Sequence, residues 1–215
     1  MNRRRRSKMP AVIAVCAAVC VVLAAGAFLF LSHRRGSSKG IALEPLSQYS
    51  AEQVPCYRQK DPLWGKDKLG DSSYTMSGSG CLTTCIAAAL TAQHPAVEPL
   101  TPGELNRLFS EAGVYNASGD IVWGKIKDAL PETEVLVASG VNNREIDQVL
   151  AEGKYPAVRV KVHGRGAWHW VLIAGTDENG YLCMDPLNGD EKLIPFSDHG
   201  GVAYSMRTVS WKTGE

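Results

Sequence analysis

The sequence predicts an α+β fold for the part of the chain that follows its first forty residues. Helical patterns come first, and a series of candidate strands follows them, which is typical of that class. Short turn sequences separate the strands, so the sheet is expected to be antiparallel. About 165 residues from Pro45 onward can bury one hydrophobic core. We therefore expect one domain, with a helical N-terminal part packed on an antiparallel sheet.

Two helices are expected in the first half of this domain. Residues 81–92 are rich in Ala and Leu and nearly free of charge, which predicts a buried helix. The segment Thr101-Pro102-Gly103-Glu104 has the form of a capping box with proline at the first helical position. It predicts a second helix that continues to about Ala112.

Two further helices are expected before the sheet. Asp120 is a candidate N-cap for a helix over residues 121–130. Asn142 or Asn143 begins another helix, and Gly153 is its expected C-terminal end.

The remaining sequence changes to β-rich segments. Val and other β-branched residues alternate with polar ones, and Asp177-Glu178-Asn179-Gly180 reads as a turn between two of the segments. The expected strands cover residues 155–162, 167–175, 181–185, 192–196 and 202–209.

The first forty residues are of a different kind. Residues 11–31 form an uninterrupted apolar run, long enough to span a bilayer as a helix. Five Lys or Arg precede this run and three follow it, which places the N-terminus in the cytoplasm and the rest of the chain outside. The alternative is a cleaved signal peptide, because Ala25-Gly26-Ala27 resembles a cleavage site. The apolar run continues past that site through Phe28-Leu29-Phe30-Leu31, which favours an uncleaved anchor.

These observations predict a single-pass protein of the cell membrane whose main domain is extracytoplasmic. Its expected parts are a cytoplasmic basic segment (1–10), a transmembrane helix (11–31), a linker (32–54), the main domain (55–209) and a C-terminal tail (210–215).

Charge and cysteine content exclude several classes of function. Beyond residue 40 the chain has 15 basic and 22 acidic side chains, a net charge of −7, so we expect no nucleic-acid partner. Cys16 and Cys20 lie inside the apolar run. The other cysteines form no CxxC spacing, so we expect no metal site and no cofactor. A disulfide between Cys56 and Cys183 is left open.

Cys81 is the candidate nucleophile. The turn Ser77-Gly78-Ser79-Gly80 delivers it to the first turn of the predicted helix at 81–92. There the helix dipole and the unpaired N–H groups lower a thiol pKa and favour the thiolate. The same N–H groups can stabilise an oxyanion. The alternative for Cys81 is a packed cysteine at the helix start. Cys85, one helical turn later, is expected to be a core residue.

His169 and Asp185 are the candidate base and its orienting group. His169 interrupts an otherwise apolar strand, and Asp185 ends the partner strand of the hairpin. A thiol nucleophile needs a base, and a carboxylate fixes the tautomer of that base. The two side chains share a face only if the hairpin has an odd loop or a bulge, and a left-handed Gly180 would provide it. A core histidine and a turn-starting Asp-Pro pair are the alternatives. His94, His163 and His199 lie in loop-like segments and are weaker candidates.

Four segments carry a family resemblance: Tyr57-Arg58-Gln59-Lys60-Asp61-Pro62-Leu63-Trp64, Gly78-Ser79-Gly80-Cys81, Trp168-His169-Trp170-Val171-Leu172-Ile173 and Asp185-Pro186. Together they resemble the papain-like cysteine peptidases related to bacteriocin-leader (double-glycine) peptidase domains. The resemblance covers roughly residues 55–209 and implies a papain-like cysteine peptidase fold. It also implies four catalytic positions, namely Gln59 as an oxyanion donor and the triad Cys81, His169 and Asp185. The chain has no transporter or ATPase region, so a double-glycine leader does not follow as its substrate.

The expected function is that of a membrane-anchored thiol hydrolase that cleaves peptide bonds in a peptide or protein substrate. A non-catalytic module that binds peptide or cell-wall material is one alternative. An acyltransferase or amidase with the same triad is another, because the triad does not choose between water and an amine. Four tryptophans are candidates for a substrate groove or for core packing: Trp64, Trp123, Trp168 and Trp170.

Overall fold

The computed structural model describes residues 39–51, 54–94 and 98–212. Its helices are α2 (Met76–Ser79), α3 (Cys81–Gln93), α4 (Pro102–Glu111), α5 (Ile126–Ala129) and α6 (Asn143–Ala151), with short 3-10 turns η1 (Trp123–Lys125), η2 (Val162–Gly164) and η3 (Phe196–His199). Its strands are β1 (Ile41–Ala42), β2 (Thr133–Val137), β3 (Ala157–Lys161), β4 (Trp168–Asp177), β5 (Gly180–Met184), β6 (Ile194–Pro195), β7 (Val202–Ala203) and β8 (Ser205–Trp211).

The predicted transmembrane segment 11–31 and the basic segment 1–10 lie outside these described residues. Within the described part, no helix is both long enough and apolar enough to cross a membrane.

The α+β class and the antiparallel sheet are confirmed. Six strands form one antiparallel sheet in the order β2-β8-β3-β4-β5-β6, and β1 pairs with β7 in a separate two-stranded sheet. Strand β2 was not expected, and it brings a segment between two helices to the sheet edge beside β8. Strand β8 runs to Trp211, two residues past the expected end of the domain, and β1 lies inside the expected linker.

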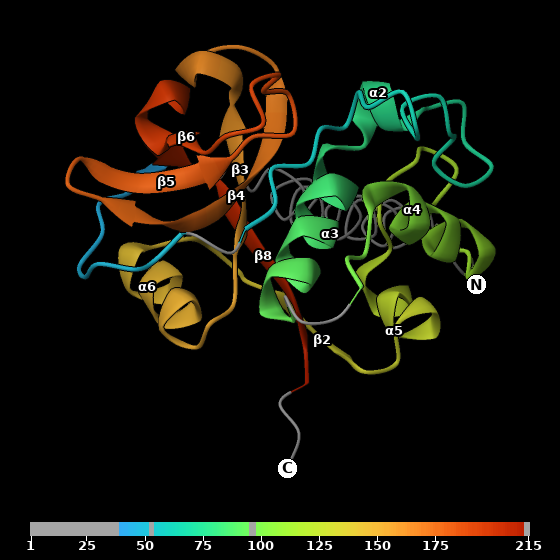
Figure 1. Ribbon diagram of the computed structural model, residues 1–215, viewed down its shortest axis with the longest axis horizontal. Helices are drawn as coiled ribbons and strands as arrows, with labels where there is room; N and C mark the ends of the chain where they lie inside the picture. Colours follow the sequence, from blue (N-terminus) through green and yellow to red (C-terminus); the bar gives the residue numbers. More distant parts are fainter. Residues whose placement is uncertain (1–38, 52–53, 95–97, 213–215) are drawn as a thin grey trace, which may run out of the picture. The chain divides into compact units, whose positions relative to one another are not determined.

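Helix α3 lies between the other N-terminal helices and the sheet (Figure 1). It is apolar almost all round, as is typical of a buried helix. On one side Ala88 and Ala89 pack against Ala157 of β3 and Leu172 of β4. On the other side its side chains join a core with α4, α5 and β8. The helix thus holds its N-terminus at the junction of the helical part and the sheet.

Helix α6 packs against the opposite side of the sheet. Side chains alternate between the two faces of a strand, so Val158 and Val171 point away from α3 and join Ile146 and Leu150 of α6. This second core also includes Phe196 of η3. Both faces of the central strands are therefore covered.

Helix boundaries follow local signals where those signals are strong. The capping box at Thr101 and Glu104 forms as expected and begins α4. Asn142 caps α6, and the expected stop Gly153 has a φ of 67°. The predicted helix over residues 121–130 is wrong in extent. Ile121 forms a bridge with Tyr115 instead, and only η1 and α5 are helical.

Candidate active site

Cys81 is the first residue of α3, as predicted. The segment before it is not an open turn but one turn of helix, α2, capped by Thr75. Gly80 joins the two helices, and a Cβ at this position would lie 2.6 Å from the carbonyl oxygen of Met76. Glycine is therefore required at this junction. The Cys81 side chain is half-buried, at the end of α3 where the N–H groups of the first turn have no partner within the helix.

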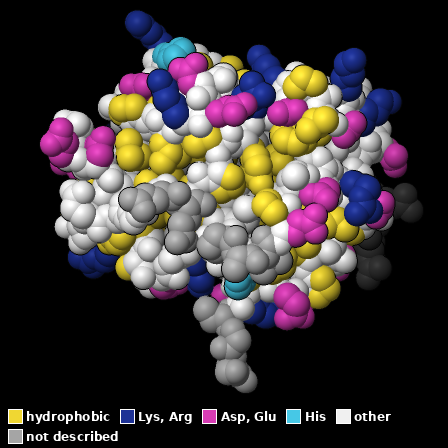
Figure 2. All heavy atoms as spheres, in the orientation of Figure 1, with side chains coloured by type: hydrophobic (Ala, Val, Ile, Leu, Met, Phe, Trp, Pro, Cys, Tyr) yellow, Lys and Arg dark blue, Asp and Glu magenta, His cyan; other side chains and the backbone are white. Residues whose placement is uncertain are grey.

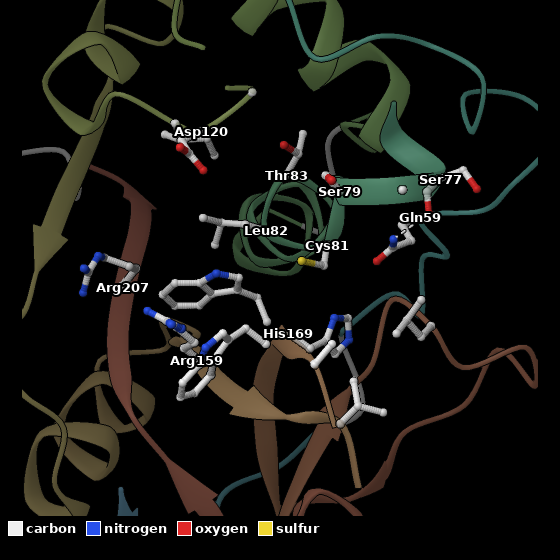
Figure 3. A pocket seen from close by; sticks show the side chains of 18 of the residues that line it. Gln59, Ser77, Ser79, Cys81, Leu82, Thr83, Asp120, Arg159, His169 and Arg207 are labelled. Atoms are coloured by element: carbon white, nitrogen blue, oxygen red, sulfur yellow. Dashed lines mark hydrogen bonds between the residues drawn. The ribbon is translucent and has the colours of Figure 1, made fainter. Parts of the chain in front are cut away.

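His169 of β4 points toward the Cys81 sulfur (Figure 3). Its Nε2 lies 2.6 Å from Oδ1 of Asp185, which follows the last residue of β5. The backbone N–H of Leu187 donates to the same carboxylate oxygen at 2.8 Å. The structure thus brings together the candidate nucleophile Cys81, the candidate base His169 and the candidate orienting group Asp185.

A β-bulge places His169 and Asp185 on the same face of the sheet. Near the turn, Gly175 pairs with Leu182, but nearer the site Leu172 pairs with Met184. The register therefore shifts by one residue between Ile173 and Gly175, and Asp185 falls opposite Val171, which shares a face with His169. Without this register shift, Asp185 would lie on the opposite face of the sheet from His169.

The need for an extra residue was predicted correctly, but its position was not. Gly180 pairs with Asp177, so the turn is the two residues Glu178 and Asn179. The irregularity lies in the middle of β4, where the segment at Tyr49–Ala51 approaches Gly175.

The surroundings of His169 favour its charged form. Burial lowers the pKa of this imidazole, but hydrogen bonds with Asp185 and Cys81 outweigh burial and raise the pKa to about 9. Burial also raises the pKa of Asp185, but the hydrogen bond from His169 and the close contact with His199 outweigh burial and hold that pKa well below its usual range. An imidazolium held between a carboxylate and a thiol is the arrangement that a thiolate nucleophile requires.

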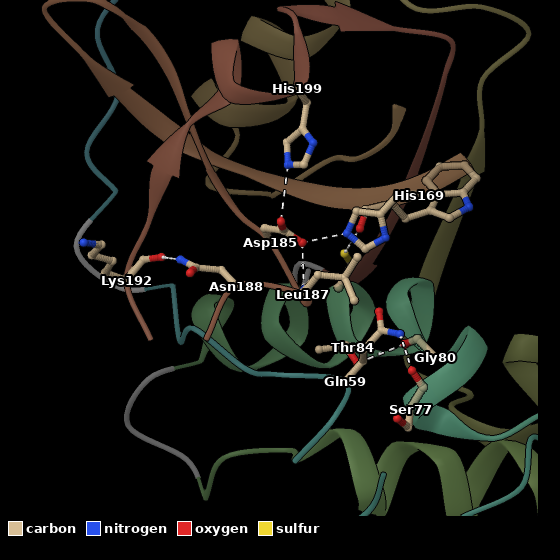
Figure 4. A network of polar contacts seen from close by, with 12 residues as sticks. Gln59, Ser77, Gly80, Thr84, His169, Asp185, Leu187, Asn188, Lys192 and His199 are labelled. Carbon is tan, nitrogen blue, oxygen red and sulfur yellow. Dashed lines mark hydrogen bonds and ion pairs between the residues drawn. The ribbon is translucent and has the colours of Figure 1, made fainter. Parts of the chain in front are cut away.

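His199, a weaker candidate from the sequence alone, is a fourth member of this cluster. It lies in η3, is buried, and has Nε2 3.3 Å from Oδ2 of Asp185 (Figure 4). The Asp185 carboxylate therefore lies between two imidazoles. A histidine in a loop carries no periodic signal, so only the folded chain reveals this neighbour.

Gln59 is buried beside the Cys81 end of α3. Its Nε2 donates to the carbonyl oxygen of Ser77 at 2.9 Å (Figure 4). Its backbone N–H donates to the carbonyl oxygen of Pro186 at 3.0 Å. The bond to Ser77 uses one of the two Nε2 protons, so the second N–H of the Gln59 amide remains as a donor. Gln59 thus lies near the Cys81 thiol, on the border of the same cavity.

Cys81, His169 and Gln59 border a cavity of about 770 Å³. Trp123, Trp168 and Trp170 line it as well, so three of the four candidate tryptophans border this cavity. Trp64 is buried instead and packs against Leu69 and Met76.

The other cysteines of the described residues differ from Cys81. Cys85 is fully buried, donates to the carbonyl oxygen of Trp170 at 3.5 Å, and has its pKa raised by burial. Cys56 and Cys183 are free thiols in this structure. Across residues 39–212, with the gaps at 52–53 and 95–97, no group of three or more His, Cys, Asp or Glu is arranged to hold a metal ion.

Among the solved structures with a similar fold is one from Bacillus anthracis, which is provisionally described as a C39-like peptidase. The match has a TM-score of 0.50 and 14% sequence identity, and covers 78% of this chain and 100% of that chain. No family model and no curated protein matches the chain. At this identity the likeness concerns the fold, and it supports the papain-like peptidase fold that the resemblance implied.

Proposed function

We propose that this protein is a cysteine peptidase in which Cys81 attacks the carbonyl carbon of a peptide bond. One observation carries the proposal: a half-buried thiol at a helix N-terminus faces a buried imidazole that lies 2.6 Å from a partly buried carboxylate, beside a cavity. This arrangement has the parts that thiol-based acyl transfer requires.

In the first half of the reaction, the Cys81 thiolate forms a C–S bond and the carbonyl becomes an oxyanion. The second Nε2 proton of Gln59 and the backbone N–H of Cys81 donate to this oxyanion. The C–N bond then breaks, and His169 gives its proton to the leaving amine. A thioester to Cys81 remains.

In the second half, neutral His169 takes a proton from a water molecule, which attacks the thioester. The C–S bond breaks, a carboxylic acid leaves, and the thiolate–imidazolium pair is restored. Asp185 stays ionised throughout because His169 and the Leu187 N–H both donate to it.

A covalent probe tests the nucleophile. A peptidyl vinyl sulfone forms a thioether with an activated cysteine, and peptide mapping by mass spectrometry locates it. We expect one adduct on Cys81, its loss in Cys81→Ala, and full labelling in the control Cys56→Ala. The pKa of the Cys56 thiol is raised by burial and by Glu191, so that thiol reacts slowly. Undiminished labelling of Cys81→Ala would overturn the assignment.

The two alternatives give different results. For a binding module, the alkylation rate of Cys81 would rise with pH as for a free thiol, whose pKa is about 8.5. For an acyltransferase, added amines would appear in the product of a peptide substrate, whereas hydrolysis gives a free carboxylate in their presence.

We further propose that residues 11–31 anchor the domain in the cell membrane with the domain outside, on the strength of the apolar run and its basic flanks. Full-length protein should stay in the membrane fraction after alkaline extraction. A protease added to intact cells should digest the domain. Release of a shortened, soluble protein would indicate signal-peptide cleavage instead.

A further inference from the structure

Two arginines line the candidate active-site cavity on one side of Cys81, while Gln59 lies on the other side (Figure 3). Arg159 comes from β3 and Arg207 from β8. Arg159 pairs with Ser205 and Ala157 pairs with Arg207, so the two arginines are diagonal neighbours on the same face of adjacent strands.

The triad does not use these arginines, and neither has a carboxylate partner in the part of the chain that the structure describes. Among the described residues, no ion pair involves Arg159 or Arg207, and no side-chain hydrogen bond involves Arg159. The Nη1 atom of Arg207 donates to the carbonyl oxygens of Ala138 and Met206, at 3.4 and 2.6 Å. Its Nε is buried and has no acceptor within the described part of the chain. Several guanidinium donors are therefore available to a ligand.

Aromatic side chains hold the two guanidinium groups in place. Cζ of Arg159 lies 4.0 Å from the ring centroid of Trp168. Cζ of Arg207 lies 5.4 Å from the ring of Trp123 and 5.8 Å from that of Trp170. Cation–π contacts orient an arginine without consuming its N–H donors. The donors are thus pre-organised rather than free to turn into solvent.

The cavity differs in charge from the rest of the domain. Lys60, Arg159 and Arg207 line it with one acidic residue, Asp120, although the chain beyond residue 40 has a net charge of −7. On the face drawn in Figure 2, the coloured acidic and basic side chains are interspersed and form no continuous basic surface. No ion pair of the described residues neutralises either arginine, and burial together with the charge of Arg159 lowers the pKa of Arg207. An anion bound between them would remove this repulsion.

We propose that Arg159 and Arg207 form a carboxylate-binding subsite that selects peptides with an acidic group close to the bond attacked by Cys81. This inference rests on the proposed peptidase function and adds the substrate class. The planar guanidinium groups suit a carboxylate because each can donate two parallel N–H bonds to its two oxygens. Two sources of that carboxylate are possible in a peptide, an Asp or Glu side chain and the free C-terminus.

Binding is measured first, with the full-length Cys81→Ala protein, so that turnover does not interfere. A library of short fluorescent peptides carries Glu at one position in turn, and each peptide has a matched Gln peptide. Every sequence is made with a free and with an amidated C-terminus. Fluorescence anisotropy gives the ratio of Kd values within each pair.

We expect at least one Glu peptide, or one free-acid peptide, to bind about tenfold more tightly than its neutral partner, and salt to reduce the ratio. A Glu preference that survives amidation identifies a side-chain subsite, and a preference for the free acid identifies C-terminal recognition. Arg159→Gln and Arg207→Gln should each lower the ratio, and the double variant should abolish it. Arg144→Gln is the matched control, because Arg144 is exposed on α6.

Folding of each variant is checked by thermal melting, and Arg207→Lys keeps the charge if Arg207→Gln unfolds. Equal binding of acidic and neutral peptides by the folded protein would overturn the subsite. So would a preference that persists in the double variant. Failure of the proposed function looks different: Cys81 would not react with the vinyl sulfone, while the acidic preference of the Cys81→Ala protein would remain. Cleavage of peptides without any acidic preference would contradict the subsite alone.

Discussion

The Nε2 atom of His199 lies 3.3 Å from Oδ2 of Asp185, on the carboxylate oxygen that His169 does not contact. His199 is buried and its ring stacks on that of His163, with a centroid distance of 6.1 Å. The left-handed Gly200, with a φ of 81°, ends η3 directly after it. A proton on Nε2 would therefore hold Asp185 in the orientation that His169 requires.

Replacing His199 with alanine should lower kcat by about tenfold with little change in KM, because Asp185 loses one of its two imidazole neighbours. The contact with His199 also lowers the pKa of Asp185. A carboxylate with a depressed pKa stabilises the fold above its unfolded pKa of about 3.8, and this contribution is lost as the pH falls. In His199→Ala, acid unfolding should thus begin at a higher pH. The control is His94→Ala, which changes an exposed histidine. Unchanged kcat and acid unfolding in His199→Ala would exclude a positioning role.

The ionisation of His169 should give the alkaline limb of the pH profile. Its pKa is raised to about 9, so kcat/KM should fall as the pH rises through that value and the imidazolium is lost. A raised histidine pKa stabilises the fold fully below its unfolded value of about 6.5, and the contribution disappears as the pH passes about 9. It amounts to about 3–4 kcal/mol at most.

This effect is measured as the difference in unfolding free energy between wild type and His169→Gln, in urea, from pH 6 to pH 10. The difference should shrink as the pH rises. NMR titration of labelled histidines in Asp185→Asn should give a lower pKa for His169 than in wild type. The same pKa in both proteins would mean that the 2.6 Å contact does not set the charge of His169.

Gln59→Ala should reduce the kcat of peptide hydrolysis by about 10²–10³-fold, because one oxyanion donor is removed. Labelling of Cys81 by a vinyl sulfone should be nearly unchanged, since forming that thioether creates no oxyanion on a peptide carbonyl. Gln48→Ala, which changes an exposed glutamine, is the control. If labelling and hydrolysis fell together, Gln59 would be needed for the fold through its bond to Ser77 rather than for the oxyanion.

Gly175→Ala should destabilise the protein by about 1–3 kcal/mol. A Cβ at Gly175 would lie 2.7 Å from the carbonyl oxygen of Tyr49 and 2.8 Å from Cβ of Ala51, beside the bulge that aligns Asp185 with His169. The matched control is Gly140→Ala, whose added Cβ meets nothing within 4 Å. Urea unfolding compares the two variants. Equal stabilities would show that the segment at residues 49–51 can move away from β4 without cost.

Local signals in the sequence were sufficient to predict several helices and strands. The capping box at Thr101 begins α4 because its hydrogen bonds join residues three positions apart. The helix from Cys81 and the hairpin of β4 and β5 follow from composition and turn residues in the same way. Strand β2 was not predicted, because it forms by pairing with β8, which lies some seventy residues further along the chain. The helix expected from Ile121 failed because Ile121 pairs with Tyr115 instead.

The sequence by itself determined the kinds of residue available for chemistry: a cysteine at a helix start, a histidine within an apolar strand, a carboxylate at the end of the partner strand and a glutamine upstream. These are matters of residue type and order, which need no knowledge of distant contacts. Only the tertiary structure decided that the bulge lies at Ala174, that His199 reaches Asp185 and that Arg159 and Arg207 share the cavity. Each of these depends on packing between segments far apart in the chain, and such contacts leave no periodic pattern in the sequence.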